Sequence, residues 1–187
     1  MRIRKQYKFE GAHIVRNCSS TRCKYSIHGH SYIVEVFLKS YKLDKGFMIY
    51  DFGLLKENVG KFIDMFDHTI VLWADDNEKY LEAMTEHSSR YIILPGSPSA
   101  EFFSVFFLKS FQLIFDELVE LKNGEGPIVV DSVIVHETAT GYAESVNEDL
   151  RTIGKDIDLT EMVVSDEIFM ENADFLKKFR TAAMDLD

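Results

Sequence analysis

The stretch His30-Ser31-Tyr32-Ile33-Val34-Glu35-Val36-Phe37-Leu38 decides the fold. One set of alternate residues, from Tyr32 to Leu38, is apolar throughout, whereas the other set includes Ser31 and Glu35. This period of two is typical of a β-strand with one buried face. Residues 3–9 show a similar alternation, with basic residues between the apolar ones, and predict a preceding strand.

Two helices are predicted after this strand pair. Asp51 is a typical N-cap residue, and apolar residues recur at three- and four-residue spacing over 52–63. Pro98-Ser99 predicts the start of a second helix. That helix, over residues 99–118, is apolar around most of its circumference, so we expect other elements to cover it heavily.

Two further strands follow, over residues 128–135 and 142–146. The order of two strands, two helices and two strands predicts an α+β fold, in which an antiparallel four-stranded sheet carries two helices on one face. Residues 147–187 contain 11 acidic and 5 basic residues and predict a helical C-terminal extension to a domain over residues 1–146. The stretch 74–94 receives no role.

Composition narrows the functional class. The chain has 187 residues, 46% of them apolar, and a net charge of −10, which argues against a dedicated nucleic-acid-binding protein. It has no apolar run long enough to span a membrane and no signal peptide, so we expect a cytoplasmic protein. Seven basic residues against one acid in residues 1–24 allow a local site for an anionic small molecule.

Three histidines form a candidate metal site. His28 and His30 are two residues apart at the start of a strand, so both imidazoles project from one face. His13 follows the neighbouring strand and could complete a three-nitrogen site. Three protein ligands with an open fourth position are typical of catalytic zinc. The alternative is that these are ordinary surface or core histidines.

A thiol and an Asp-His pair are candidate catalytic groups. Cys23 stands between Arg22 and Lys24, and neighbouring positive charge favours the thiolate. The alternative is an inert thiol, and Cys18 is a weaker candidate for the same role. Asp67-His68 could move protons near neutral pH, although such a dipeptide often marks only a turn or a helix end.

Glu137-Thr138 ends the long apolar strand over residues 128–135. A carboxylate there can accept two parallel hydrogen bonds from the N–H pair of a guanine or pterin ring. The alternative is a strand-terminal charge in water.

Taken in order, these motifs resemble the 6-pyruvoyl-tetrahydropterin synthase superfamily, and most closely its bacterial branch, the 6-carboxy-tetrahydropterin synthases of queuosine biosynthesis, which serves tRNA modification. The resemblance covers residues 7–146 and rests on Phe9-Glu10-Gly11-Ala12-His13, Cys23, His28-Gly29-His30, Gly46-Phe47-Met48-Ile49-Tyr50-Asp51-Phe52, Asp67-His68, Pro98-Ser99-Ala100-Glu101 and Glu137-Thr138.

The resemblance implies a tunnelling fold, assembled as a homo-oligomer, typically a hexamer built from two trimers. It implies zinc held by His13, His28 and His30, with Cys23 as the proton-transferring thiol. It also implies that Asp67 and His68 complete a catalytic triad, which a neighbouring subunit can supply. Glu137, with Thr138 beside it, would anchor the pterin ring.

Three functions remain open at this point. The first converts 7,8-dihydroneopterin triphosphate to 6-carboxy-5,6,7,8-tetrahydropterin with release of acetaldehyde and triphosphate. The second is the pyruvoyl-forming reaction, which eliminates triphosphate but keeps the side chain. The third is a zinc-containing pterin- or purine-binding module without turnover, which has no need of a thiol beside an open metal site.

Overall fold

A computed structural model describes residues 1–186, which build one seven-stranded sheet in the order β6-β5-β2-β1-β3-β4-β7. The strands are β1 (Arg2–His13), β2 (His28–Lys39), β3 (Thr69–Trp73), β4 (Tyr91–Leu94), β5 (Val129–His136), β6 (Tyr142–Val146) and β7 (Val163–Val164).

The two predicted N-terminal strands form the centre of this sheet. β1 and β2 pair antiparallel over their whole lengths, from Arg2 opposite Lys39 to His13 opposite His28. β2 then pairs antiparallel with β5, and β5 with β6. The predicted α+β fold is confirmed, and the predicted antiparallel strands are present as the group β1, β2, β5 and β6.

The prediction of a four-stranded, purely antiparallel sheet was wrong. β3 pairs parallel with β1 through Gly11–His13, and β4 pairs parallel with β3. The stretch 74–94 supplies helix α4 (Glu78–His87) and then β4, because parallel neighbours need a crossover connection. β7, from the C-terminal segment, pairs antiparallel with β4. The added strands have five, four and two residues, too short for a clear periodic pattern.

The two predicted helices begin where capping side chains satisfy free backbone N–H groups. The Asp51 carboxylate accepts hydrogen bonds from the amides of Gly53 and Leu54, and the Ser99 hydroxyl accepts one from the amide of Phe102, which confirms both predicted starts. The elements are α1 (Thr21–Tyr25), α2 (Phe52–Leu55), η1 (Lys56–Gly60), α3 (Lys61–Asp64), α4, α5 (Ala100–Leu113), η2 (Ile114–Leu118), η3 (Asn147–Arg151), η4 (Gly154–Asp156), η5 (Leu159–Glu161) and α6 (Asp166–Met184).

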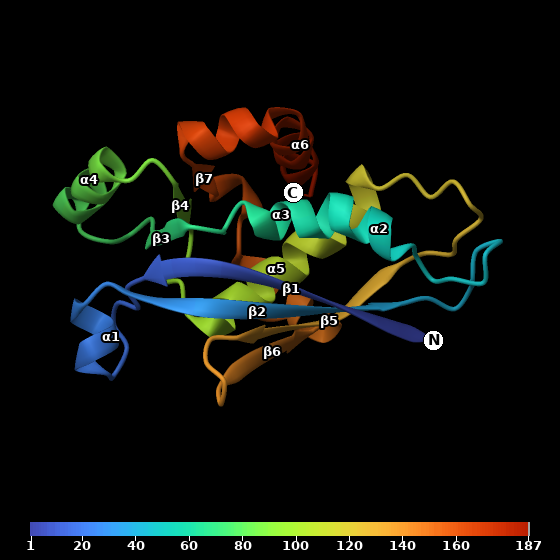
Figure 1. The fold of residues 1–187 in the computed structure, drawn as a ribbon, viewed down its shortest axis with the longest axis horizontal. Helices are drawn as coiled ribbons and strands as arrows, with labels where there is room; N and C mark the ends of the chain where they lie inside the picture. Colours follow the sequence, from blue (N-terminus) through green and yellow to red (C-terminus); the bar gives the residue numbers. More distant parts are fainter. Residues whose placement is uncertain (187) are drawn as a thin grey trace.

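The core lies between the sheet and the helices. α5 packs against β5 and β6, and its phenylalanines Phe103, Phe106, Phe107 and Phe111 are fully buried, which confirms the expected heavy coverage. α6 packs against α5 and η2, on the side away from the strands. Figure 1 shows α1 and α4 together at the end of the molecule where β1 ends and β2 begins. No helix within residues 1–186 has both the length and the apolar character needed to cross a bilayer.

Candidate active site

Three imidazoles meet at the end of the β1–β2 pair. The register places His13 directly opposite His28, and His30 lies two residues further along the same face of β2. One ring nitrogen from each histidine lies within 4.8 Å of those of the other two. The backbone permits this approach because Gly29 has no side chain: a Cβ there would lie 3.1 Å from the Gly11 carbonyl oxygen. The sequence-based prediction that these histidines converge is therefore confirmed.

The hydrogen bonds of the three rings leave nitrogens free for a cation. His13 Nδ1 lies 2.6 Å from the Pro98 carbonyl oxygen, and His28 Nδ1 lies 3.0 Å from that of Ser26. A carbonyl only accepts, so each Nδ1 donates and each Nε2 keeps its lone pair, as in most histidines that bind metal. His30 Nε2 is buried with no hydrogen-bond partner within residues 1–186. This donor set fits a divalent metal ion.

Burial keeps His13 neutral. Loss of solvation lowers the pKa of His13 to about 4; the bond to Pro98 opposes this shift, and the charges of His28 and His30 add to it. The ring is 1% exposed, and the Tyr32 hydroxyl lies 3.3 Å from its Nε2. A neutral imidazole is the form that binds a metal, so His13 is available as a ligand at neutral pH without giving up a proton.

Glu137 lies beside the three histidines. Its Oε1 is 3.6 Å from His13 Nε2 and 3.9 Å from His30 Nε2. The backbone of Glu137 is held at the end of β5 by the turn to β6, where its amide donates to the Gly141 carbonyl. The Thr138 hydroxyl accepts hydrogen bonds from the amides of Thr140 and Gly141, so it closes this turn.

Cys23 lies on α1, in the connection between β1 and β2, and its side chain is partly exposed. The Cys23 carbonyl accepts a hydrogen bond of 3.1 Å from the amide of Val15, which ties the α1 segment to the end of β1. Cys18 is in the same connection, and its thiol donates to the Ser20 carbonyl.

Asp67 and His68 form a tight turn next to β1. The Asp67 carboxylate accepts the Glu10 amide at 2.7 Å through Oδ1 and lies 2.9 Å from His68 Nδ1 through Oδ2. Desolvation raises the pKa of the Asp67 carboxyl, but the hydrogen bonds from Glu10 and His68 outweigh it, so the pKa lies below its ordinary value. His68 has a positive φ of 56°, and its amide donates to the Glu10 carbonyl. The charged carboxylate fixes the tautomer of an exposed imidazole.

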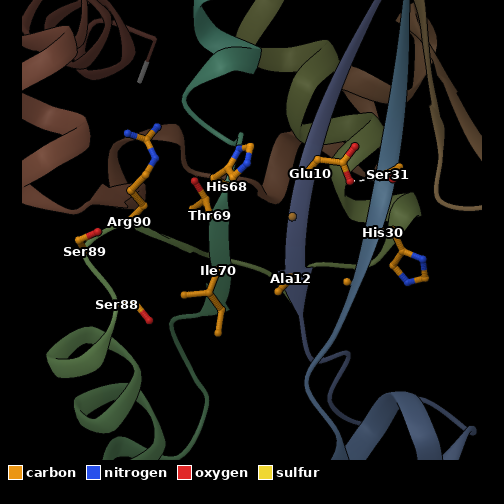
Figure 2. Close-up of a pocket in the computed structure, with 12 residues that line it drawn as sticks. Glu10, Ala12, His30, Ser31, His68, Thr69, Ile70, Ser88, Ser89 and Arg90 are labelled. Carbon is orange, nitrogen blue, oxygen red and sulfur yellow. Dashed lines mark hydrogen bonds between the residues drawn. The ribbon is translucent and has the colours of Figure 1, made fainter.

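A cavity of about 680 Å³ lies along β1, β2 and β3, lined by residues that include Glu10, His30, Ser31, His68 and Arg90. Figure 2 shows His68 on the β3 side of β1 and His30 on the outer side of β2, so the two imidazoles belong to separate parts of the wall of this cavity. The sequence did not predict that the Pro98 carbonyl and Tyr32 lie next to His13. A backbone acceptor carries no residue-type signal, and the alternation in β2 marks Tyr32 only as a residue of the buried face.

Comparison with known proteins gives the family of this chain. Residues 2–148 match the family described as 6-pyruvoyl tetrahydropterin synthase. A protein of Helicobacter pylori strain J99, named 6-carboxy-5,6,7,8-tetrahydropterin synthase, is 43% identical over 80% of this chain and 74% of its own length. A protein of the same name from Aquifex aeolicus is 29% identical over 78% of this chain and 98% of its own length.

Solved structures share the fold at low sequence identity. An uncharacterized protein from Wolinella succinogenes superposes with a TM-score of 0.64 at 21% identity, over 79% of this chain and 98% of that one. The 6-pyruvoyl tetrahydropterin synthase of Caenorhabditis elegans gives 0.54 at 18% identity, over 79% and 95%. With a match to residues 2–148 and a relative at 43% identity, this chain belongs to the 6-pyruvoyl tetrahydropterin synthase family.

Proposed function

We propose that this protein is a 6-carboxy-5,6,7,8-tetrahydropterin synthase, a lyase of queuosine biosynthesis acting in the cytoplasm. Its substrate is 7,8-dihydroneopterin triphosphate, and it releases acetaldehyde and triphosphate. The observation that carries the proposal is the convergence of three imidazoles with the Glu137 carboxylate at one point. The names of the Helicobacter and Aquifex relatives support the choice of this product within the family.

His13, His28 and His30 would hold zinc through their Nε2 atoms. When bound, zinc supplies a Lewis acid that stabilises negative charge on the side-chain oxygens of the substrate. The Pro98 and Ser26 carbonyls fix the orientation of two of these rings, so the site is organised before the substrate arrives.

Cys23 and His68 would carry the protons. The reaction removes protons from carbons of the side chain next to the ring, which requires a base, and the Cys23 thiolate would take that role. His68 would exchange protons through Nε2, because its Nδ1 is held by the Asp67 carboxylate. Asp67 keeps this tautomer and orientation.

Glu137 would anchor the pterin ring. Its carboxylate can accept two parallel N–H hydrogen bonds from the ring, and its position beside His13 and His30 would hold the side chain of the substrate at the metal. Thr138 stands next to it and supports the turn. Some of the basic residues among the first 24 residues would meet the triphosphate.

The separation of His68 from His30 supports an active site completed by a second copy of the chain. Within residues 1–186, β3 pairs with β1 through Gly11–His13, and no strand pairs with this edge of β1 from Arg2 to Phe9 or with the outer edge of β6. We propose that these edges join copies into a trimer, and two trimers into a hexamer. Residues 1–146 would form the tunnelling-fold domain and residues 147–187 its extension.

Product analysis tests this function. Zinc-loaded protein is incubated with 7,8-dihydroneopterin triphosphate, and the pterin product and acetaldehyde are measured. Stoichiometric 6-carboxytetrahydropterin and acetaldehyde are expected. Triphosphate release without acetaldehyde would instead identify the pyruvoyl-forming reaction, and binding without any product would identify a pterin-binding module.

A further inference from the structure

We propose that Arg16, held in place by Asp76, positions the Cys23 segment for proton transfer. This inference rests on the proposed role of Cys23. Arg16 is a positioning residue: it acts on the backbone around the thiol, through contacts within the chain. The proposal also gives a role to the stretch 74–94, which carries Asp76.

Hydrophobic packing does not fix the Cys23 segment. α1 is five residues long and buries none of them, and Tyr25 and Ile27 nearby are 67% and 48% exposed. A helix this short is unstable without tertiary contacts. Its position therefore depends on hydrogen bonds to the rest of the chain.

Two successive residues after β1 supply such bonds. The amide of Val15 donates to the Cys23 carbonyl at 3.1 Å, and Arg16 Nη1 donates to the Lys24 carbonyl at 2.9 Å. The carbonyls of the thiol-bearing residue and of its neighbour thus both accept hydrogen bonds from the segment that follows β1. The second bond comes from a long side chain, so it is only as rigid as the guanidinium that makes it.

Asp76 makes that guanidinium rigid. Arg16 Nε lies 3.0 Å and 2.8 Å from the two carboxylate oxygens of Asp76, whose side chain is 7% exposed. The guanidinium also lies 4.9 Å from the centre of the Tyr80 ring, within cation–π range. Asp76 itself accepts the amide of Asn77, the N-cap residue of α4. A shielded pair with several bonds is a stronger constraint than an exposed ion pair.

The arrangement links two segments that are far apart in sequence. The β1–α1 connection carries Cys23, and the β3–α4 connection carries Asp76; Arg16 joins them. Figure 1 shows α1 and α4 at the same end of the molecule. The crossover that adds β4 to the sheet therefore also provides the anchor for the thiol segment.

Amide hydrogen exchange and turnover together test the inference. Arg16→Gln and Asp76→Asn are made in the zinc-loaded protein, with Arg151→Gln as the matched control. Arg151 is an exposed arginine of η3, outside the proposed active site, so its loss removes one positive charge but leaves the Arg16–Asp76 pair intact. We expect exchange in residues 20–26 to accelerate at least about tenfold in the first two variants and to be unchanged in the control.

In Arg16→Gln and Asp76→Asn, kcat should fall at least about tenfold, because the thiol is misplaced. KM and zinc content should stay near wild type, because the substrate and metal sites are unchanged. The double variant should be no worse than either single variant, since both break one pair. Arg16→Lys, which keeps the charge, should recover part of kcat.

Unchanged exchange in Arg16→Gln and Asp76→Asn would overturn the inference, and so would faster exchange with normal kcat. Full activity of Cys23→Ala would instead overturn the proposed role of the thiol, whatever the exchange result. The two failures are therefore distinguishable.

Discussion

His13 Nδ1 lies 2.6 Å from the carbonyl oxygen of Pro98. This contact joins the last residue of β1 to the residue before Ser99, the N-cap of α5. α5 is fixed in turn by its buried phenylalanines, so packing of the core determines which nitrogen of His13 faces the other two histidines. The orientation of the proposed metal ligand His13 thus follows from the hydrophobic core.

Replacement of Glu137 by glutamine should weaken pterin binding. The variant loses the charged acceptor of the two hydrogen bonds to the ring. We expect the binding free energy to weaken by about 1.5–3 kcal/mol, so that Kd rises roughly 10- to 150-fold. Calorimetric titration of zinc-loaded protein with a substrate-like pterin measures this change.

The zinc content of Glu137→Gln should equal that of the wild type. The control variant is Glu144→Gln, which replaces an exposed acid on β6 and should bind the pterin as tightly as the wild type does. Loss of zinc from the Glu137 variant would show that this carboxylate belongs to the metal site and not to ring recognition.

Activity should be restored by mixing two inactive variants. If Cys23 and His68 of one active site come from different chains, Cys23→Ala and His68→Ala subunits mixed at equal amounts and reassembled should recover about a quarter of wild-type activity. The assay is turnover after co-refolding, with each variant refolded alone as the control. A mixture as inactive as its parts would mean that one chain supplies both groups.

The metal-free protein should lose stability as the pH falls from about 6.5 to about 4. Burial lowers the pKa of His13 to about 4, so in this range the unfolded chain binds a proton that the folded chain does not. The free energy of unfolding therefore rises with pH, by at most about 3 kcal/mol, and the gain is complete above about pH 6.5.

Urea unfolding at pH 5 and pH 7, in the presence of a chelator, measures this dependence. His13→Gln should reduce the difference between the two pH values, and His87→Gln, at an exposed position, should not. An equal pH dependence in His13→Gln and wild type would argue that His13 is not buried in its neutral form.

Truncation of Phe179 should strongly destabilise the fold. This side chain of α6 is fully buried, and its ring centre lies 5.1 Å from that of Phe62. Phe179→Ala is expected to lower the free energy of unfolding by about 3–5 kcal/mol, because it leaves a cavity. Met170→Ala, on the exposed side of α6, should change it by less than about 0.5 kcal/mol. If urea unfolding shows small and equal losses of unfolding free energy in the two variants, the result would contradict the packing of α6 on the core.

Local patterns predicted the elements with strong local signals. The alternation in β2 and the capping residues Asp51 and Ser99 depend on neighbours within a few residues, so the sequence carries them directly. The convergence of His13 with His28 also followed from the antiparallel order of β1 and β2.

The remaining features depend on pairings between distant segments. Parallel and edge pairings determine the positions of β3, β4 and β7 in the sheet. These strands are too short to show a periodic pattern in the sequence. The contacts of Arg16 with Asp76 and with the Lys24 carbonyl likewise depend on the folded chain. The sequence alone does not show which of the basic residues near the N-terminus makes them.

The ligand set of the metal tests the account most directly. Zinc-edge X-ray absorption of the zinc-loaded protein should give one zinc per chain, with three imidazole nitrogens at about 2.0–2.1 Å and one oxygen at the open position. A sulfur neighbour at about 2.3 Å would mean that Cys23 or Cys18 binds the metal and is not a free thiol. That result, or a protein that binds no zinc, would contradict the account.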